Sequence, residues 1–272
     1  MSAVPPHLNW LVKDSRKLLS ADGISIELWE LQHQPEPKIL SAWARHFRNH
    51  YCADGEIDIL RAGTPLSRAD YLVNLKFPDA RKSPGPSIRS GDFAEILVAD
   101  YVEYVLKFWV PRCRYDRKTI RNESTKGSDI MGFKFVYSDK TSSADTLLIF
   151  ESKAQLVGEK NKAILQIAIE HSIKDELRKA ESLNALKQRL LDRNENGNAE
   201  KISRFQSSED NPYKTLFGAA AMFSSDLLDY EVLQKSDATS HPHKKNLSLV
   251  VISGSKLMEL THKLYEVAAN EA

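Results

Sequence analysis

The segment from residue 127 to residue 153 constrains the fold most, because it has the pattern of a two-stranded hairpin. Ile130 to Tyr137 is strand-like, Ser138 to Asp145 is a polar loop, and Thr146 to Lys153 is a second apolar run that ends in Glu151-Ser152-Lys153. Short apolar runs bounded by turn residues are typical of strands. Asp129 follows a Gly127-Ser128 turn at the start of the first strand. The hairpin therefore brings an Asp, a Glu and a Lys to one end of a sheet.

The pairing register decides whether the two carboxylates meet. Side chains alternate along a strand, so Glu151 and Lys153 share a face. If Tyr137 pairs with Thr146, Asp129 lies on the opposite face from Glu151, whereas a shift by one residue brings them together. A bulge at Gly132 could make that adjustment. We predict that both carboxylates lie on one face, and opposite faces would refute the site.

An Asp, a Glu and a Lys at strand ends suit metal-dependent phosphodiester hydrolysis. Mg²⁺ prefers hard oxygen ligands, typically one or two carboxylates with water and phosphate oxygens. Such an ion can activate water and neutralise phosphate oxygens. A neighbouring Lys can hold the water or offset charge in the transition state. Asp129 and Glu151 are therefore the candidate metal ligands, and Lys153 is the candidate catalytic cation.

Composition excludes several other classes of protein. The chain has 272 residues, 42% of them hydrophobic, and a formal net charge of +1. A balanced charge means that nucleic-acid contacts must come from local basic patches. Two cysteines are too few for a disulfide framework. No signal peptide and no membrane-spanning run is read, so we expect a cytoplasmic protein with no membrane association.

Strands mixed with helices predict an α/β fold. The Pro- and Gly-rich stretch 82–91 is expected to be a loop that separates an N-terminal α/β subdomain, residues 1–85, from a second domain, residues 86–272. Periodicity predicts strands at 24–31, 71–77 and 247–252, helices at 37–52, 92–109, 160–193 (with one possible break), 216–228 and 256–268, and a turn at 194–198.

Three further groups have competing interpretations. Glu95 could be a third acid of the site, but Asp92-x-x-Glu95 also has the form of a capping box at a helix start, which we favour from the residues alone. His46 and His50 are four apart on a predicted helix with Cys52 nearby; because Phe47 stands where a zinc protease has its Glu, we favour a structural role over a zinc site. A basic segment could contact DNA or be a solvated loop; its residues are Arg112, Arg114, Arg117, Lys118, Arg121 and Lys126.

The helix acid, hairpin Asp and Glu-x-Lys occur in the order seen in the PD-(D/E)xK nuclease superfamily. Gly91-Asp92-Phe93-Ala94-Glu95, Gly127-Ser128-Asp129-Ile130 and Phe150-Glu151-Ser152-Lys153 together resemble one family more closely, the HamA nuclease subunits of the Hachiman anti-phage defence system. The matching motifs lie between residues 91 and 153, and the rest of the chain agrees only in general layout.

The resemblance implies a restriction-endonuclease-like mixed sheet flanked by helices and a DNase that uses Mg²⁺ or Mn²⁺. Asp129, Glu151 and the Ser152 carbonyl would bind the metal, Lys153 would be the catalytic lysine, and Glu95 the helix acid near the metal. It also implies a superfamily 2 helicase partner resembling HamB, and residues 1–85 are a candidate docking region. Two alternatives remain open: a non-catalytic subunit that docks a helicase or DNA, and a homodimeric restriction or junction-resolving nuclease.

Overall fold

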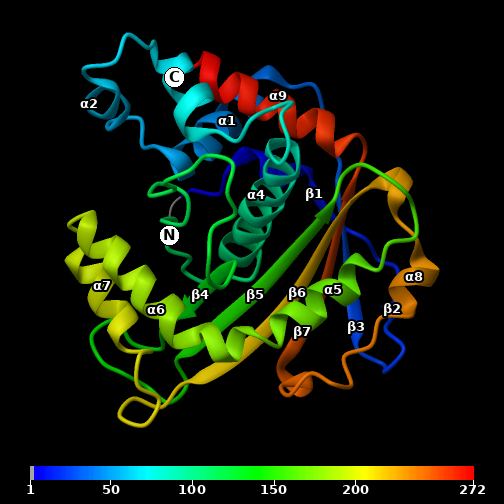
Figure 1. Cartoon of the computed structure of the whole chain (residues 1–272). Helices are drawn as coiled ribbons and strands as arrows, with labels where there is room; N and C mark the ends of the chain where they lie inside the picture. Colours follow the sequence, from blue (N-terminus) through cyan, green and yellow to red (C-terminus); the bar gives the residue numbers. More distant parts are fainter. Residues whose placement is uncertain (1–2) are drawn as a thin grey trace.

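The computed structural model describes residues 3–272, which fold around one mixed sheet (Figure 1). The strands are β1 (Leu11–Lys13), β2 (Leu18–Leu19), β3 (Ser25–Leu31), β4 (Ile130–Lys134), β5 (Thr146–Gln155), β6 (Lys214–Ser224) and β7 (Leu247–Gly254). Their order is β1-β3-β7-β6-β5-β4, with β2 also paired to β3. The central pairs β3–β7, β7–β6 and β6–β5 are parallel, and both edges are antiparallel. The expected α/β class is confirmed.

Helices cover both faces of this sheet (Figure 1). The longer ones are α1 (Pro37–Tyr51), α4 (Gly85–Asp100), α5 (Ile164–Ser172), α6 (Asp175–Asp192), α7 (Asn196–Ser203) and α9 (Leu257–Asn270). Short helices α2 (Ile57–Arg61), α3 (Arg68–Tyr71) and α8 (Tyr230–Gln234) lie in the connections. Within residues 3–272, no helix is long and apolar enough to cross a bilayer.

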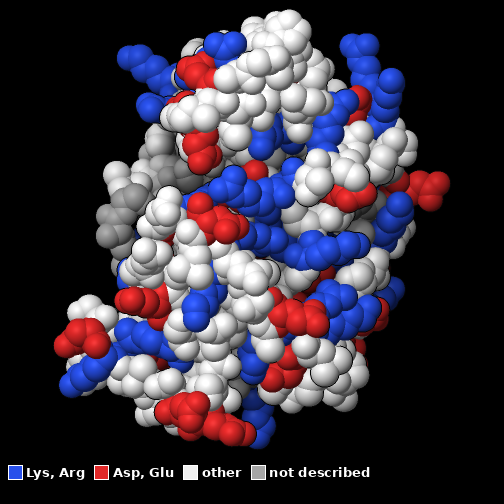
Figure 2. Space-filling view, turned by 60° about the vertical axis from the view of Figure 1, so that its left-hand side comes forward, with Lys and Arg blue, Asp and Glu red and all other residues white. Residues whose placement is uncertain are grey.

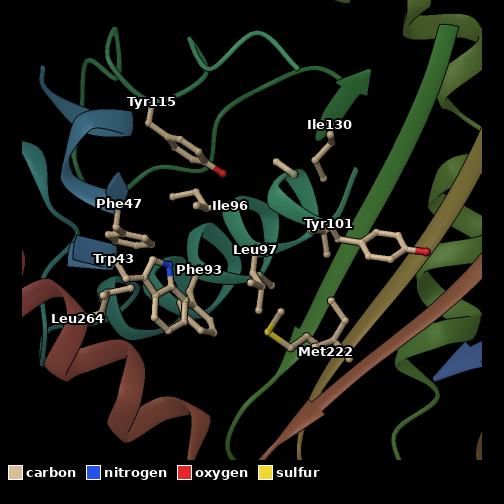
Figure 3. Close-up of a cluster of buried hydrophobic side chains, with 14 of the residues drawn as sticks. Trp43, Phe47, Phe93, Ile96, Leu97, Tyr101, Tyr115, Ile130, Met222 and Leu264 are labelled. Carbon is tan, nitrogen blue, oxygen red and sulfur yellow. The ribbon is translucent and has the colours of Figure 1, made fainter. Parts of the chain in front are cut away.

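Alternation along β5 builds a separate apolar core on each face. Leu148 and Phe150 pack with α1, α4 and α9, where Trp43, Phe93 and Leu264 form the cluster drawn in Figure 3. Leu147 and Ile149 pack on the other face with α5, α6 and α7. Glu151 and Lys153 continue the alternation of Leu147 and Ile149, so they lie on the face covered by α5.

Residues 71–77 do not form the predicted strand. They complete α3 and continue as a wide helical turn, η2 (Leu72–Lys76). The cause is a helix start just upstream, where the Ser67 hydroxyl accepts the Asp70 backbone N–H at 3.1 Å. This Ser-x-x-Asp cap outweighs the strand-like alternation that follows it.

The predicted helix at 216–228 is also wrong, because these residues form β6 in the middle of the sheet. Its Ala-rich stretch has high helix propensity, but β5 and β7 pair with it on both sides. Small residues fit a strand that is covered on both faces. Gly218 is required there, since a Cβ would lie 2.2 Å from the Phe150 ring.

Helix boundaries also differ around the predicted 82–91 loop. Helix α4 begins at Gly85 with Pro86 in its first turn, which proline favours, and ends at Asp100. A wider turn, η3 (Tyr101–Val105), follows, so the helix expected at 92–109 starts and stops earlier. The predicted 160–193 helix is α5 and α6 with its break at residues 173–174. The turn predicted at 194–198 is shorter than expected, because α7 already begins at Asn196.

The remaining predicted elements are confirmed to within two residues at their ends: the strands 24–31 and 247–252, and the helices 37–52 and 256–268. Strand β4 is shorter than predicted and ends at Lys134. Strand β3 of the N-terminal region pairs with β7, and α1 packs on α9, so residues on both sides of position 85 share one sheet and one core. The division into two domains stays a prediction.

Candidate active site

The hairpin register places Asp129 and Glu151 on the same face of the sheet. Ile130 pairs with Phe150 and Lys134 with Thr146, without interruption. The next residue outward, Asp129, therefore falls opposite Glu151. The expected bulge at Gly132 does not form; glycine is needed there because a Cβ would lie 2.9 Å from both Phe108 and Val102. The register condition set by the sequence is met.

Glu151 is a buried acid among charged neighbours. It forms an ion pair with Lys153, and Nδ1 of His171 on α5 lies 3.5 Å from its Oε1. Burial, together with the negative charge of Asp129, raises the pKa of Glu151 to about 8. Burial lowers the pKa of Lys153, but Glu151 and Asp129 outweigh it and hold that pKa above its usual range. The negative charge of Asp129 next to the Glu151 carboxyl makes a site that attracts a cation.

Asp129 is held in place by two donors. Its Oδ2 accepts the Ser152 backbone N–H at 3.1 Å, and its Oδ1 accepts Nη2 of Arg114 at 2.8 Å. Arg114 also donates from Nε to Glu95 at 2.8 Å. The guanidinium thus links the α4 acid to the hairpin acid and fixes their relative positions.

Glu95 is a half-buried acid that accepts hydrogen bonds from Arg114 and Tyr115. The Tyr115 hydroxyl donates to its Oε2 at 2.5 Å, next to the Arg114 contact. Burial raises the pKa of Glu95 to about 7, although Arg114 opposes that shift. Glu95 is therefore joined to Asp129 through Arg114, and the structure places it at the site's edge.

The predicted capping box at Asp92 and Glu95 is wrong. Both residues lie inside α4, which begins at Gly85, and no side chain caps that helix. Asp92 instead accepts the Tyr51 hydroxyl at 2.7 Å and pairs with Lys118 at 3.0 Å, with both charged side chains buried. The start of α4 was predicted too late because Pro84 and Pro86 were assigned to a loop. A proline in the first turn is compatible with a helix.

The predicted DNA-contacting residues have two different environments. Arg112, Arg114, Lys118 and Arg121 each pair with an acidic side chain and are partly buried. Arg117 and Lys126 are exposed, with no ion pair to any described side chain. Figure 2 shows basic side chains gathered across the middle of one face and interrupted by acidic ones. The basic segment is therefore mainly a set of internal ion pairs that carry two exposed cations.

Sequence reasoning missed two residues that border the site, Asp175 and His171. Asp175 starts α6 and is fully buried, and neither carboxylate oxygen has a hydrogen-bond partner of normal geometry among residues 3–272. Burial raises its pKa to about 6, and the neighbouring Ser128 hydroxyl offsets only part of that cost. In the sequence both residues lay inside the segment predicted as a long charged amphipathic helix at 160–193 with one possible break.

A cavity of about 220 Å³ adjoins Glu95 and Asp129. Its wall includes Glu95, Arg114 and Asp129, apolar residues such as Met131 and Leu186, and His50 from α1. The acids therefore border a space that reaches from the hairpin to α1.

The donor chemistry of Asp129 and Glu151 fits a hard divalent cation. Each offers carboxylate oxygens, the Ser152 carbonyl lies between Glu151 and Lys153 along β5, and Mg²⁺ commonly completes such a shell with water. The three acids Glu95, Asp129 and Glu151 do not bring three ligand atoms together. Among the described residues, only His46, His50 and Asp100 place one ligand atom each within 4.8 Å of the others.

Comparison with protein families identifies the chain. The model of the HamA family matches residues 5–268. Comparisons with curated proteins and with solved structures gave no significant match. Since the family model spans nearly the whole chain, this chain belongs to the HamA family, a component of the Hachiman anti-phage defence system.

Proposed function

We propose that this chain is a metal-dependent deoxyribonuclease, the nucleolytic effector of its defence system. The observation that carries the proposal is the register of the β4–β5 hairpin, which puts Asp129 opposite Glu151 with Lys153 paired to it. Bound Mg²⁺ or Mn²⁺ would activate a water and neutralise phosphate oxygens. Asp129, Glu151 and the Ser152 carbonyl would hold the ion.

The other catalytic roles, proton donation and orientation of the metal ligand, fall to groups of the protein itself. Lys153 keeps its proton at neutral pH, because two carboxylates raise its pKa. It therefore acts as a donor toward a water or phosphate oxygen and not as a base. The Ser152 N–H and Arg114 orient Asp129, and Glu95 holds Arg114 in turn.

We further propose that the chain acts on DNA in the cytoplasm, in complex with a HamB-like superfamily 2 helicase. Membership of the HamA family supports this partnership. Arg117 and Lys126 are the basic residues of the 112–126 segment that are free to meet phosphate. Residues 1–85 remain the candidate docking region.

The test is DNA cleavage by the purified complex with Mg²⁺. We expect Glu151→Gln and Lys153→Met each to lower the cleavage rate by at least about 100-fold, as loss of a catalytic group does. Glu159→Gln and Lys160→Met are matched controls, because both residues are exposed just beyond β5 and should leave the rate unchanged. Each variant's partner binding and unfolding midpoint are measured alongside.

A wild-type complex that cuts no DNA in Mg²⁺ or Mn²⁺ would overturn the nuclease assignment and favour a non-catalytic docking subunit. The mass of the active species separates the remaining alternative: a homodimer without helicase would indicate a restriction-type or junction-resolving nuclease.

A further inference from the structure

A second group of ligating side chains lies away from the hairpin, where α1 meets the end of α4. His46 and His50 project from successive turns of α1, and Asp100 is the last residue of α4. The Nε2 atoms of the two histidines are 3.4 Å apart, and Nε2 of His46 is 2.9 Å from Oδ1 of Asp100. The sequence showed the histidine pair but not the acid, which stands 50 residues further along the chain.

A single proton on His46 satisfies only one of these contacts. Nε2 of His46 carries at most one hydrogen, yet it faces both Oδ1 of Asp100 and Nε2 of His50. If that hydrogen points at Oδ1 of Asp100, it is not available to Nε2 of His50. If it points at Nε2 of His50, the lone pairs of Asp100 receive no hydrogen from His46. A cation placed between the three atoms attracts all of them at once.

The spacing matches a small transition-metal ion. Zn²⁺ bonds of about 2.0–2.1 Å in a tetrahedral site separate neighbouring ligand atoms by about 3.4 Å. The His46–His50 distance has that value, and the His46–Asp100 distance is 0.5 Å shorter, so a small outward movement of one side chain admits the ion. Imidazole nitrogens favour Zn²⁺ over Mg²⁺, which distinguishes this cluster chemically from the hairpin site, whose proposed ligands are all oxygen atoms.

Hydrogen bonds from neighbouring side chains hold the Asp100 carboxylate where it can bind a metal ion. Oδ2 of Asp100 contacts Nε2 of His7 at 3.0 Å, and Nη2 of Arg112 donates to Oδ1 at 2.8 Å. Outer partners of this kind orient ligands in metal sites. Arg112 also pairs with Glu103 at 2.7 Å, so Asp100, Glu103 and Arg112 together carry one negative charge at the mouth of the cluster.

We propose that His46, His50 and Asp100 form a zinc-binding site with one coordination position left for water. The ion would clamp α1 to α4, five residues beyond Glu95 on the same helix. His50 also lines the cavity that Glu95 and Asp129 border, so the clamp would fix one wall of that cavity.

The experiment measures zinc on the full-length chain, prepared without a histidine tag, stripped with a chelator and dialysed against Zn²⁺. We expect one tightly held zinc per chain by elemental analysis, in wild type and in Asp129→Asn alike. His46→Gln and His50→Gln should each weaken binding by more than the roughly 10–100-fold that follows loss of an outer partner. His262→Gln, on α9, is the control and should bind as wild type does.

A second readout needs no variant in the cluster. Co²⁺ added to the stripped wild-type chain should give the visible absorption of a tetrahedral site, and Zn²⁺ should abolish it and raise the unfolding midpoint. Failure of the stripped chain to retain Zn²⁺, an octahedral Co²⁺ spectrum, or unchanged zinc affinity in folded His46→Gln and His50→Gln would each overturn the site. A purely hydrogen-bonded cluster would give those results.

Discussion

Single residues show how burial changes the meaning of a motif. Asp92 looked like a helix cap in the sequence, but it lies inside α4 and shares a buried pocket with Lys118 and Tyr51. Burial raises its pKa, and Lys118 opposes the shift. Its role is to neutralise the Lys118 ammonium next to the apolar core and not to begin a helix.

The two roles of Asp92, helix cap or buried ion-pair partner, predict different losses in the free energy of unfolding. Replacing a cap costs about 1 kcal/mol of folding free energy. Breaking a buried ion pair by removing one partner costs about 3–5 kcal/mol, because the other charge remains unpaired. We therefore expect Asp92→Ala to lower the free energy of unfolding by about 3 kcal/mol or more in urea titrations. Asp92→Ala with Lys118→Met should recover part of that loss, and a single-variant loss near 1 kcal/mol would contradict the buried role.

At the scale of secondary-structure elements, tertiary contacts outweighed the intrinsic helix propensity of β6. β6 reads as a helix because of Ala219-Ala220-Ala221, yet it lies between two parallel strands. Its Gly218 carries the Phe150 ring directly over its Cα, where an alanine Cβ would come within 2.2–2.4 Å of three ring atoms. That contact joins the central strand to the strand that holds Glu151.

Gly218→Ala should therefore destabilise the chain by about 1–3 kcal/mol, the usual cost of overpacking a core. Phe150→Leu removes the ring and should make the same glycine substitution much less costly, so the two changes are expected to couple in a double-mutant cycle. Gly197→Ala is the control: it lies in α7 with open space around its Cα, and alanine there should stabilise by about 0.5–1 kcal/mol. Equal effects of Gly218→Ala in both Phe150 backgrounds would contradict this contact.

The hairpin could be predicted from the sequence because the pattern that indicates it lies within one short segment. Two apolar runs, one polar loop and period-2 alternation were enough to place Asp129, Glu151 and Lys153 at one end of the sheet. The register could be stated only as a condition, since residues 135–137 looked strand-like but lie beyond the end of β4. Asp175 and the Arg114 link could not be predicted, because they depend on how α6 and the 112–121 segment pack against the hairpin.

At the scale of the whole molecule, charge is balanced overall but concentrated inside. The formal net charge is +1, yet Glu95, Asp129, Glu151 and Asp175 gather at one end of the sheet. Arg114 contacts Glu95 and Asp129, and Lys153 contacts Glu151. Without a bound cation, burial and neighbouring negative charge raise the pKa values of Glu95, Glu151 and Asp175, and the pKa of Glu151 lies at about 8 against an ordinary 4.5.

The sign of the resulting pH dependence follows from that shift. The folded state binds the Glu151 proton more tightly than the unfolded chain, so this group's contribution to metal-free stability falls as pH rises from about 4.5 to about 8. A metal ion needs the carboxylate, so below pH 8 it must displace a proton to bind. Apparent Mg²⁺ affinity should therefore rise with pH by up to about tenfold per unit and level off above about pH 8.

Cleavage rates at subsaturating Mg²⁺, measured across this range at constant ionic strength, test the argument. Glu95, with a pKa of about 7, should steepen the profile at its acidic end if it also loses its proton when the ion binds. Saturating Mg²⁺ should shift the rise to lower pH, because metal and proton compete for the same oxygens. Glu159→Gln, exposed and outside the cluster, should give the wild-type profile. A Mg²⁺ affinity that does not change between pH 6 and pH 8 would contradict the combination of a raised Glu151 pKa and metal binding by its carboxylate, since a protonated acid must release its proton to bind the cation.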